Sequence, residues 1–281
     1  MALNVNTNVS SIQAQRNLNK AQNGVQKSLE RLSTGMRINS AADDAAGMAI
    51  SSKLKSQIRG LDQAERNAND GISLIQTAEG SLEQMGDILG RARELAVQSS
   101  SDTLTSSDRS FIDSEFRSLV NEMDRIVSTT EFNGRKLLNG SASAGVSFQI
   151  GINNTANDRI TVSITNVGTK KIGTSTTNSL FSQSLSTASK AQASLSVIDD
   201  AISDLSTVRA KLGSAQNRLD VSIENLGSGI ENLSAANARI RDVDVAKETA
   251  ALTRGQILSQ AGISVLAQAN QAPQAALSLI G

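Results

Sequence analysis

Apolar side chains recur every seven residues over one long segment in the first third of the chain. This series comprises Leu61, Ala68, Ile75, Leu82, Leu89 and Ala96. The layer between its members comprises Ala64, Gly71, Ala78, Met85 and Ala92. Such a double seam is typical of a helix that packs in coiled-coil fashion. We therefore expect a helix over residues 56–99, which would be roughly 65 Å long at 1.5 Å per residue.

A second seven-residue series lies nearer the C-terminus and is richer in leucine. It comprises Ile198, Leu205, Leu212, Leu219, Leu226, Leu233 and Ile240. Its neighbouring layer comprises Leu195, Ile202, Ile223 and Ile230. Arg209, Gln216 and Asn237 interrupt that layer, and polar residues in a seam fix helix register more often than they carry chemistry. A second long helix is expected here.

A shorter helix between the two seams has apolar side chains at alternating steps of four and three residues. These are Ile112, Phe116, Leu119, Met123 and Ile126. Ser106, Ser107 or Asp108 is expected to cap its N-terminus, because their side-chain oxygens accept from free backbone N–H groups.

The apolar period changes to two between this helix and the second seam. The alternating residues are Val146, Phe148, Ile150, Ile152, Ile160, Val162 and Ile164. With a turn at 153–158, this pattern predicts a β-hairpin at about 145–165. Residues 166–187 follow as a Ser/Thr/Gly/Asn-rich connector, expected to be an exposed loop. The fold class is thus mainly α: an elongated antiparallel coiled-coil-like helical bundle with a small β-hairpin region.

Charge is missing from both ends of the chain. Residues 1–15 carry none, and none of the 27 residues after Arg254 is charged. With 19% charged residues overall, a tail of that length would hold about five. Its Gln and Asn side chains make the tail too polar for a bilayer, whereas its apolar side chains are too numerous for a solvated tail.

The N-terminal segment carries a matching apolar stripe. It comprises Ala14, Leu18, Ala21, Val25, Leu29, Leu32 and Met36, whereas Val5, Val9 and Ile12 lie on a different arc of the helix. The termini are expected to form an amphipathic helical pair. That pair either packs on its own bundle or is buried in a polymer of identical chains, where a non-closing contact gives a helical filament. The sequence favours the polymer, because only many neighbours can cover more than one face.

The candidates for packing in such a polymer come from both termini. They are Val5, Val9, Ile12, Leu18, Val25, Leu29, Leu32, Ile257, Leu258, Ile263, Val265, Leu266, Leu277 and Leu279.

Composition removes most enzyme chemistry. The 281 residues include no Cys and no His, which excludes thiol and imidazole catalysis and Cys/His zinc sites. The 27 Lys and Arg balance the 27 Asp and Glu, so nothing attracts nucleic acid or an anionic membrane in general. The N-terminus lacks the basic and apolar regions of a Sec signal peptide. The sequence contains no stretch of about 18 apolar residues, so we expect no membrane-spanning helix.

The remaining motifs do not assemble a site for catalysis, a cofactor or a metal. Asp43 and Asp44 lack a third convergent ligand and precede an Ala-rich run, where an Asp is an ordinary helix cap. Gly227 and Gly229 lack the preceding strand and third glycine of a dinucleotide-binding loop. The basic residues over 53–59 have no interleaved aromatic side chains on which bases could stack. We expect no enzymatic activity and no cofactor.

Five segments carry a family resemblance. They are RLSTGMRINSAADDAAGMAIS (31–51), DGISLIQTAEGSLEQMGDILGRARELAVQSS (70–100), FNGRKLLNG (132–140), LGSAQNRLDVSIENLGSGIENL (212–233) and QILSQAGISVLAQANQAPQAALSLIG (256–281). Together they resemble bacterial flagellin, the flagellar filament subunit, in a short form that lacks outer domains.

The resemblance implies that different segments of the chain form different domains of the filament subunit. Residues 1–45 and 240–281 would form the inner coiled-coil core of the filament, and residues 46–239 a rod-like helical domain that includes the hairpin. The implied function is structural. The chain would self-polymerise into the helical propeller used for swimming motility.

The resemblance also implies partners and a location. These are further copies of the chain, hook-associated and cap proteins, an export chaperone and the flagellar type III export apparatus. The implied location is extracellular, in the flagellum, reached without a Sec signal peptide. No nucleic-acid partner and no membrane insertion are implied.

Two host innate receptors complete the implied partners. Leu89, Arg91, Glu94 and Leu95 match the family's Toll-like receptor epitope, although Gly90 replaces a Gln and removes a hydrogen-bonding side chain. The tail residues Val265, Leu266, Leu277 and Leu279 match the segment read by the cytosolic inflammasome sensor.

Three alternatives remain beside a flagellin. A hook–filament junction protein shares the end helices but does not polymerise extensively. An intracellular coiled-coil scaffold is disfavoured by the charge-free tail. An enzyme would need a carboxylate or Lys site that the sequence does not assemble.

Overall fold

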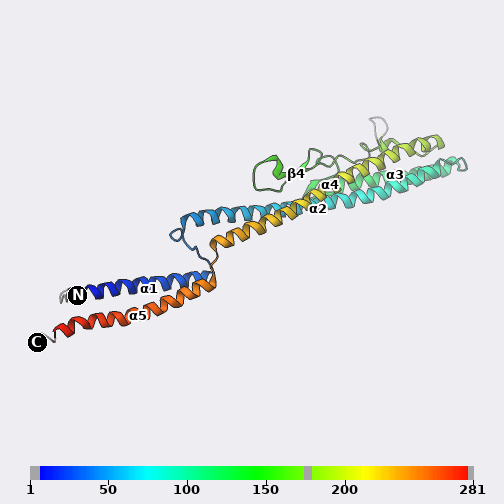
Figure 1. Cartoon of the computed structure of the whole chain (residues 1–281). Coiled ribbons are helices and arrows are strands. Elements are labelled where there is room, and N and C mark those ends of the chain that lie inside the picture. The colour runs from blue at the N-terminus through cyan, green and yellow to red at the C-terminus, as the bar shows by residue number, and fades with distance from the viewer. Residues whose placement is uncertain (1–6, 174–178, 278–281) are drawn as a thin grey trace. The chain divides into compact units, whose positions relative to one another are not determined.

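The computed structural model describes residues 7–173 and 179–277, and side chains through residue 271. The chain divides into two compact units. We call residues 1–58 and 231–281 the terminal unit, and residues 59–230 the central unit. Two long helices contribute to both units (Figure 1).

Helices dominate both units, which confirms the mainly α fold class. The helices of the described residues are α1 (Val9–Thr34), α2 (Ala45–Ser99), α3 (Ser106–Thr129), α4 (Ala188–Arg241) and α5 (Val245–Leu277). The α2 helix begins well before the predicted residue 56. Asp44 Oδ1 accepts the N–H of Gly47 at 2.9 Å, so this carboxylate caps the Ala-rich run as expected.

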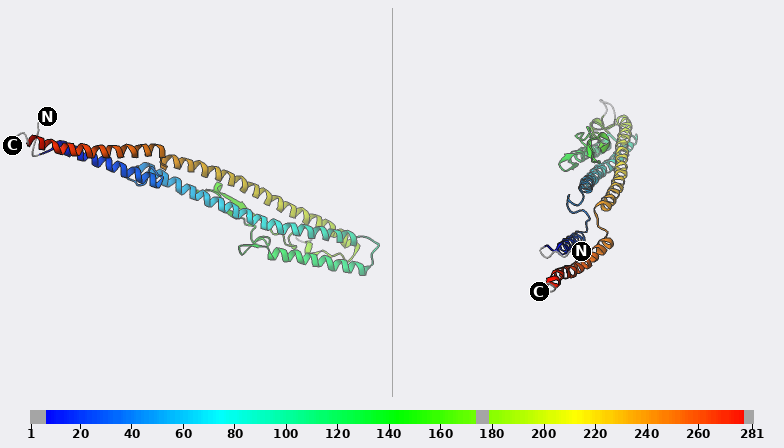
Figure 2. Two further views of the ribbon diagram at one scale, coloured as in Figure 1. Left: turned by 90° about the horizontal axis from the view of Figure 1, so that it is seen from below. Right: turned by 60° about the vertical axis from the view of Figure 1, so that its left-hand side comes forward.

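The predicted seams meet in the core of the central unit. Gly71 of α2 lies against Leu219 of α4, and Gly86 lies against Leu205, so the two helices run antiparallel (Figure 2). The buried seam residues include Ala68, Ile75, Leu82, Leu89 and Ala96 of α2, and Ile198, Leu205, Leu212 and Leu219 of α4. The seven-residue period therefore identified the packed faces correctly.

Two polar interruptions of the second seam link α4 to α2. In the central unit, Arg209 Nη2 lies 3.6 Å from Glu79 Oε1. In the terminal unit, Ser51 Oγ donates to Asn237 Oδ1 at 2.7 Å. Both contacts fix one helix against the other, as polar seam residues were expected to do.

The predicted N-cap of α3 is wrong by one residue. Thr105 is the cap: its hydroxyl accepts the N–H of Asp108 at 3.3 Å, and the Asp108 carboxylate accepts the N–H of Thr105 at 3.0 Å. This reciprocal pair is a capping box. On the apolar face, Leu119 is only half-buried, and Val120 is buried in its place.

The predicted hairpin is present with shorter strands. Strand β3 (Val146–Gln149) pairs antiparallel with β4 (Arg159–Val162). A 3-10 turn at Ala156–Asp158 occupies the connection. Ile152, which the alternation placed in a strand, lies in the turn region and is exposed.

A second, tiny hairpin was not predicted. Strands β1 (Glu131–Phe132) and β2 (Arg135–Lys136) pair antiparallel. Asn133 and Gly134 join them with φ of 49° and 77°, the left-handed values that an Asn-Gly turn supplies. That dipeptide was a usable signal.

The expectation of an exposed connector at 166–187 is wrong for much of the segment. Val167, Ile172, Leu180 and Leu185 are buried in the central core, and a 3-10 turn spans Leu180–Ser182. These apolar side chains are spaced too irregularly for any period to reveal them, so the polar composition concealed their packing. Residues 174–178 lie outside the described part.

Candidate assembly surface

The α1 and α5 helices of the terminal unit form an antiparallel pair (Figures 1 and 2). At one end of the pair, Asn8 Nδ2 donates to the backbone oxygen of Ala269 at 2.7 Å. At the other end, Arg31 Nη1 lies 3.6 Å from Glu248 Oε2. Asn8 also caps α1, because its Oδ1 accepts the N–H of Ser11 at 3.1 Å.

Glycines of α5 let the two helices approach closely. A Cβ atom at Gly255 would lie only 2.8 Å from Cγ2 of Val25, and one at Gly262 would lie 3.4 Å from Cδ1 of Leu18. Four of the packing candidates are half-buried along this pair: Leu18, Val25, Leu32 and Leu266.

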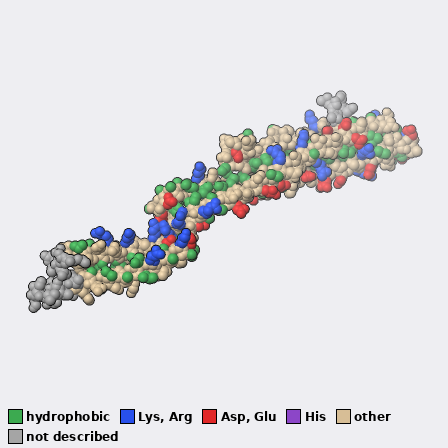
Figure 3. Space-filling model, in the orientation of Figure 1, with side chains coloured by type: hydrophobic (Ala, Val, Ile, Leu, Met, Phe, Trp, Pro, Cys, Tyr) green, Lys and Arg blue, Asp and Glu red, His purple; other side chains and the backbone are tan. Residues whose placement is uncertain are grey.

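The other described packing candidates are exposed. Val9 is 62% exposed and Ile257 is 63% exposed. The full set is Val9, Ile12, Leu29, Ile257, Leu258, Ile263 and Val265. Val5, Leu279 and the side chain of Leu277 lie outside the described residues. Apolar side chains of the terminal pair are open on the face shown in Figure 3, and exposed apolar surface of this kind marks an interaction site.

The predicted stripe of α1 is displaced at one position. Leu29 is exposed, whereas Ser28 is buried together with Ala14. Neighbouring helix residues point about 100° apart, and the serine is the one that lies toward the partner helix. Hydrophobicity gave no signal for Ser28, because the contact selects a small side chain rather than an apolar one.

Two grooves of different chemistry flank the pair. The first has a volume of about 530 Å³ and is lined largely by small and apolar residues, including Leu18, Ala21, Gly24, Gly255 and Leu258. The second has a similar volume of about 530 Å³. Its lining includes Gln22, Gln26, Gln256 and Gln260. Both terminal helices therefore contribute to grooves on the surface of the pair.

Asp43 organises the turn between α1 and α2 instead of capping a helix. Its Oδ1 lies 2.6 Å from Lys27 Nζ, and its Oδ2 accepts the N–H of Ser40 at 3.1 Å and that of Asn39 at 3.3 Å. The hydrogen bond from Lys27, followed by that from Ser40, holds the pKa of Asp43 well below its usual range. The carboxylate stays charged and ties this turn to α1.

The receptor-epitope candidates lie on α2 in two different environments. Leu89 and Leu95 are buried in the central core. Arg91 Nη1 lies 2.9 Å from Glu94 Oε2 and its Nη2 lies 2.9 Å from Glu115 Oε1 of α3. The hydrogen bonds that Arg91 donates to Glu94 and then to Glu115 raise the pKa of Arg91. The solvent-facing group is thus Arg91, Glu94 and Glu115, and the sequence pattern missed the last.

The described residues hold no cluster of three or more His, Cys, Asp or Glu side chains suited to a metal ion. Over the same residues, none of the helices combines the length and apolarity needed to cross a bilayer. The prominent features are apolar side chains left open on long helices. These features define a helical protein that packs against other proteins.

Comparisons with known proteins identify the family within this class. Residues 5–143 match the model of the bacterial flagellin N-terminal helical region, and residues 195–280 match that of the C-terminal helical region. A flagellin of Halalkalibacterium halodurans is 47% identical over 276 residues, covering 98% of this chain and 99% of the relative. A flagellin of Bacillus subtilis is 42% identical over 305 residues, covering 99% of this chain and 100% of the relative.

A solved structure also shares the fold. The putative flagellar hook-associated protein from Vibrio parahaemolyticus has a TM-score of 0.61 and covers 71% of this chain and 100% of that chain. At 14% identity, it shows the fold alone and does not decide between a filament subunit and a junction protein. The flagellin relatives, with far higher identity over nearly the full chain, decide that question.

The chain belongs to the bacterial flagellin family, in a short form without outer domains. It is a structural subunit of the extracellular flagellar filament that drives motility, and it is not an enzyme.

Proposed function

We propose that the α1–α5 pair is the part of the subunit that builds the inner core of the filament. Residues 1–45 and 240–281 form this core, and residues 46–239 form a surrounding rod-like layer. The contacts are made by the packing candidates, with Val5, Leu277 and Leu279 among them. The observation that carries the proposal is the set of apolar side chains, 49% to 63% exposed, on two helices that pair with each other.

The physical reason is the amount of apolar surface that the pair leaves in water. Burying such surface contributes about 25 cal/mol per Å², so other copies of the pair gain by covering it. The charge-free sequence after Arg254 lets many copies meet in one place without the cost of burying charges.

Deleting residues 256–281 tests the proposal. We expect the truncated chain to keep the folded central unit, because that unit's core contains none of the deleted residues. Filaments should be abolished. The measurement is electron microscopy of concentrated protein seeded with filament fragments, with circular dichroism to confirm helicity.

A gentler variant separates packing from the loss of a helix. Ile257→Ser combined with Val265→Ser should keep α5 intact and slow elongation strongly. Ala261→Ser, which adds the same hydroxyl to an exposed position of α5 without removing apolar bulk, serves as the control. Normal filaments from the truncated chain or from the double variant would refute the proposed core.

The exposed apolar side chains of α5 also need to be covered before the subunit reaches the filament. A flagellar export chaperone binds α5 before assembly, which would keep its apolar side chains covered, and the type III export apparatus carries the chain out of the cell. Cap and hook-associated proteins receive it at the growing end. Competition between a chaperone and filament seeds for labelled subunit tests the shared use of α5.

Recognition by a host Toll-like receptor would use the polar edge of α2. Arg91, Glu94 and Glu115 are the accessible groups there, while Leu89 and Leu95 hold the helix in place from the core. An Arg91→Ala variant should lose receptor activation in a reporter assay, and Gly90→Gln should increase it. The inflammasome sensor would read the tail that includes Val265, Leu266, Leu277 and Leu279.

A further inference from the structure

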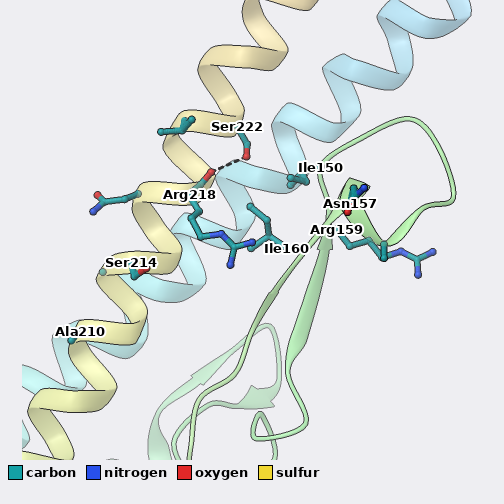
Figure 4. Close-up of a pocket in the computed structure, with 12 residues that line it drawn as sticks. Ile150, Asn157, Arg159, Ile160, Ala210, Ser214, Arg218 and Ser222 are labelled. Carbon is teal, nitrogen blue, oxygen red and sulfur yellow. Dashed lines mark hydrogen bonds between the residues drawn. The ribbon is translucent and has the colours of Figure 1, made fainter.

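A groove of the central unit lies between the β3–β4 hairpin and α4 and has a volume of about 900 Å³ (Figure 4). Ile150 and Ile160 from the hairpin side face α4 across it. Its lining contains two arginines, Arg159 and Arg218, and no carboxylate. The groove therefore has a mixed apolar and polar lining and carries positive charge.

Arg218 is the cation that faces this groove. Its side chain extends from α4 toward Ile160, whereas that of Arg159 points away from α4 (Figure 4). Arg159 bonds to the Gln149 side chain. Within the described part of the chain, the guanidinium of Arg218 has no hydrogen-bond or ion-pair partner. The residues three and four positions away along α4 are all uncharged.

A glycine in the same groove is not required by any contact within the described part of the subunit. Gly213 lines the groove in the interior of α4, and a Cβ atom there would meet nothing within 4 Å. A glycine in the interior of a helix destabilises that helix relative to Ala. Packing inside this chain does not require that cost, whereas a partner that approaches the α4 backbone closely would require it.

A surface of α2, which we call the acidic strip, also combines charged side chains that lack ion-pair partners with glycines that nothing else in the described part of the subunit covers. Glu83 and Asp87 are exposed, one helical turn apart, and have no ion-pair partner among the described residues. Gly80 and Gly90 flank them on the same helix, and Cβ atoms at both would also meet nothing within 4 Å. The carboxylates therefore stand beside bare backbone that another chain can approach.

We infer that the groove of one copy receives the Glu83–Asp87 strip of a second copy, with Arg218 facing the carboxylates. This inference rests on the proposed assembly and adds an interface in the central unit to it. The two surfaces are complementary: the groove presents a cation without an ion-pair partner among the described residues, and the strip presents two such carboxylates beside exposed helix backbone. Opposite charges of this kind direct association and fix register.

Arg218 cannot reach the strip within its own subunit. Gly71 of α2 packs against Phe148 of the hairpin and Leu219 of α4, at the level of Arg218. Glu83 and Asp87 follow about 18 Å and about 24 Å farther along α2 at 1.5 Å per residue. Since groove and strip are different patches, the contact is heterologous and repeats from copy to copy without closing, which suits a filament.

A charge swap in the full-length chain tests the interface. Arg218→Glu alone and the Glu83→Lys/Asp87→Lys pair alone should each slow seeded elongation about tenfold or more, because like charges then face each other. Combining all three substitutions should restore most of the rate. Lys190→Glu reverses an exposed charge of α4 outside the groove and is the matched control.

Each outcome bears on the inference. Elongation at the normal rate by either charge-reversed variant overturns it, as does a triple variant that stays folded but remains slow. If Arg218→Glu fails to fold by circular dichroism, Arg218→Gln replaces it and should still slow elongation. Normal elongation of these variants, combined with failure of Ile257→Ser/Val265→Ser, would reject the groove while leaving the proposed core intact.

Gly213→Ala gives a readout that a folding defect cannot imitate. The monomer should become more thermally stable, because Ala favours the helix, while elongation slows because the methyl group occupies the contact. Faster or unchanged elongation by this stabilised variant would count against close packing in the groove.

Discussion

Phe111 and Phe116 lie on the same helix, α3, with opposite surroundings. Phe116 is 1% exposed and Phe111 is 74% exposed. Replacing the buried ring should leave a cavity, so Phe116→Ala is expected to lower the free energy of unfolding by about 3 to 5 kcal/mol. Phe111→Ala, the matched control, should change it by less than about 0.5 kcal/mol. Chemical denaturation of both variants checks the difference, and equal effects would contradict the assigned face of α3.

Asp43 provides a pH-dependent prediction at the same scale. Because the folded state depresses the pKa of this carboxyl, its stabilising contribution is complete above the unfolded value of about 3.9 and is lost progressively as the pH falls below it. Asp43→Asn should therefore lower the thermal midpoint of α1 and its turn at pH 7, and the difference from the parent chain should shrink below about pH 4.

The neighbouring carboxylate is the control for this variant. Asp44→Asn keeps an oxygen that can accept the N–H of Gly47, and Asn is as good a cap as Asp. It should leave the midpoint nearly unchanged. A pH-independent effect of Asp43→Asn would show that its charge is not what holds the turn.

Between helices, the spacing of α1 and α5 depends on glycine. Gly255→Ala would place a methyl group 2.8 Å from Val25 Cγ2, which should destabilise the pair by about 1 to 3 kcal/mol. Gly24→Ala, where a Cβ meets nothing within 4 Å, should instead stabilise α1 by up to about 1 kcal/mol. Thermal unfolding followed by circular dichroism distinguishes the two, and stabilisation by both would contradict the close approach.

Helices and the main hairpin were well predicted because their patterns repeat. The seams through Ile75 and Leu212 run over many heptads, and each repeat supports the others. The small hairpin at Asn133–Gly134 has two-residue strands, too short to show any alternation. The connector packs through scattered residues such as Ile172 and Leu180, which only the surrounding helices select.

For the whole subunit, the two units should differ in what assembly does to them. In the monomer, amide protons of α5 near Ile257 and Val265 lack covering side chains and should open readily. In the filament they should exchange at least roughly 100-fold more slowly, while those of α3 near Phe116 change little. Hydrogen exchange with mass spectrometry measures both, and equal protection of α5 in monomer and filament would contradict a role for it in assembly.

The sequence by itself determined the packed faces of α2 and α4, the hairpin, the absence of Cys and His chemistry and the charge-free termini, because period and composition are local properties. Only the tertiary structure decided which face of α1 meets α5, that Ser28 and not Leu29 is covered, and that Asp43 binds Lys27. It also brought Arg218 to the hairpin groove. Those outcomes depend on contacts between residues far apart in the chain, where the fit of small and charged side chains, rather than hydrophobicity, selects the partner.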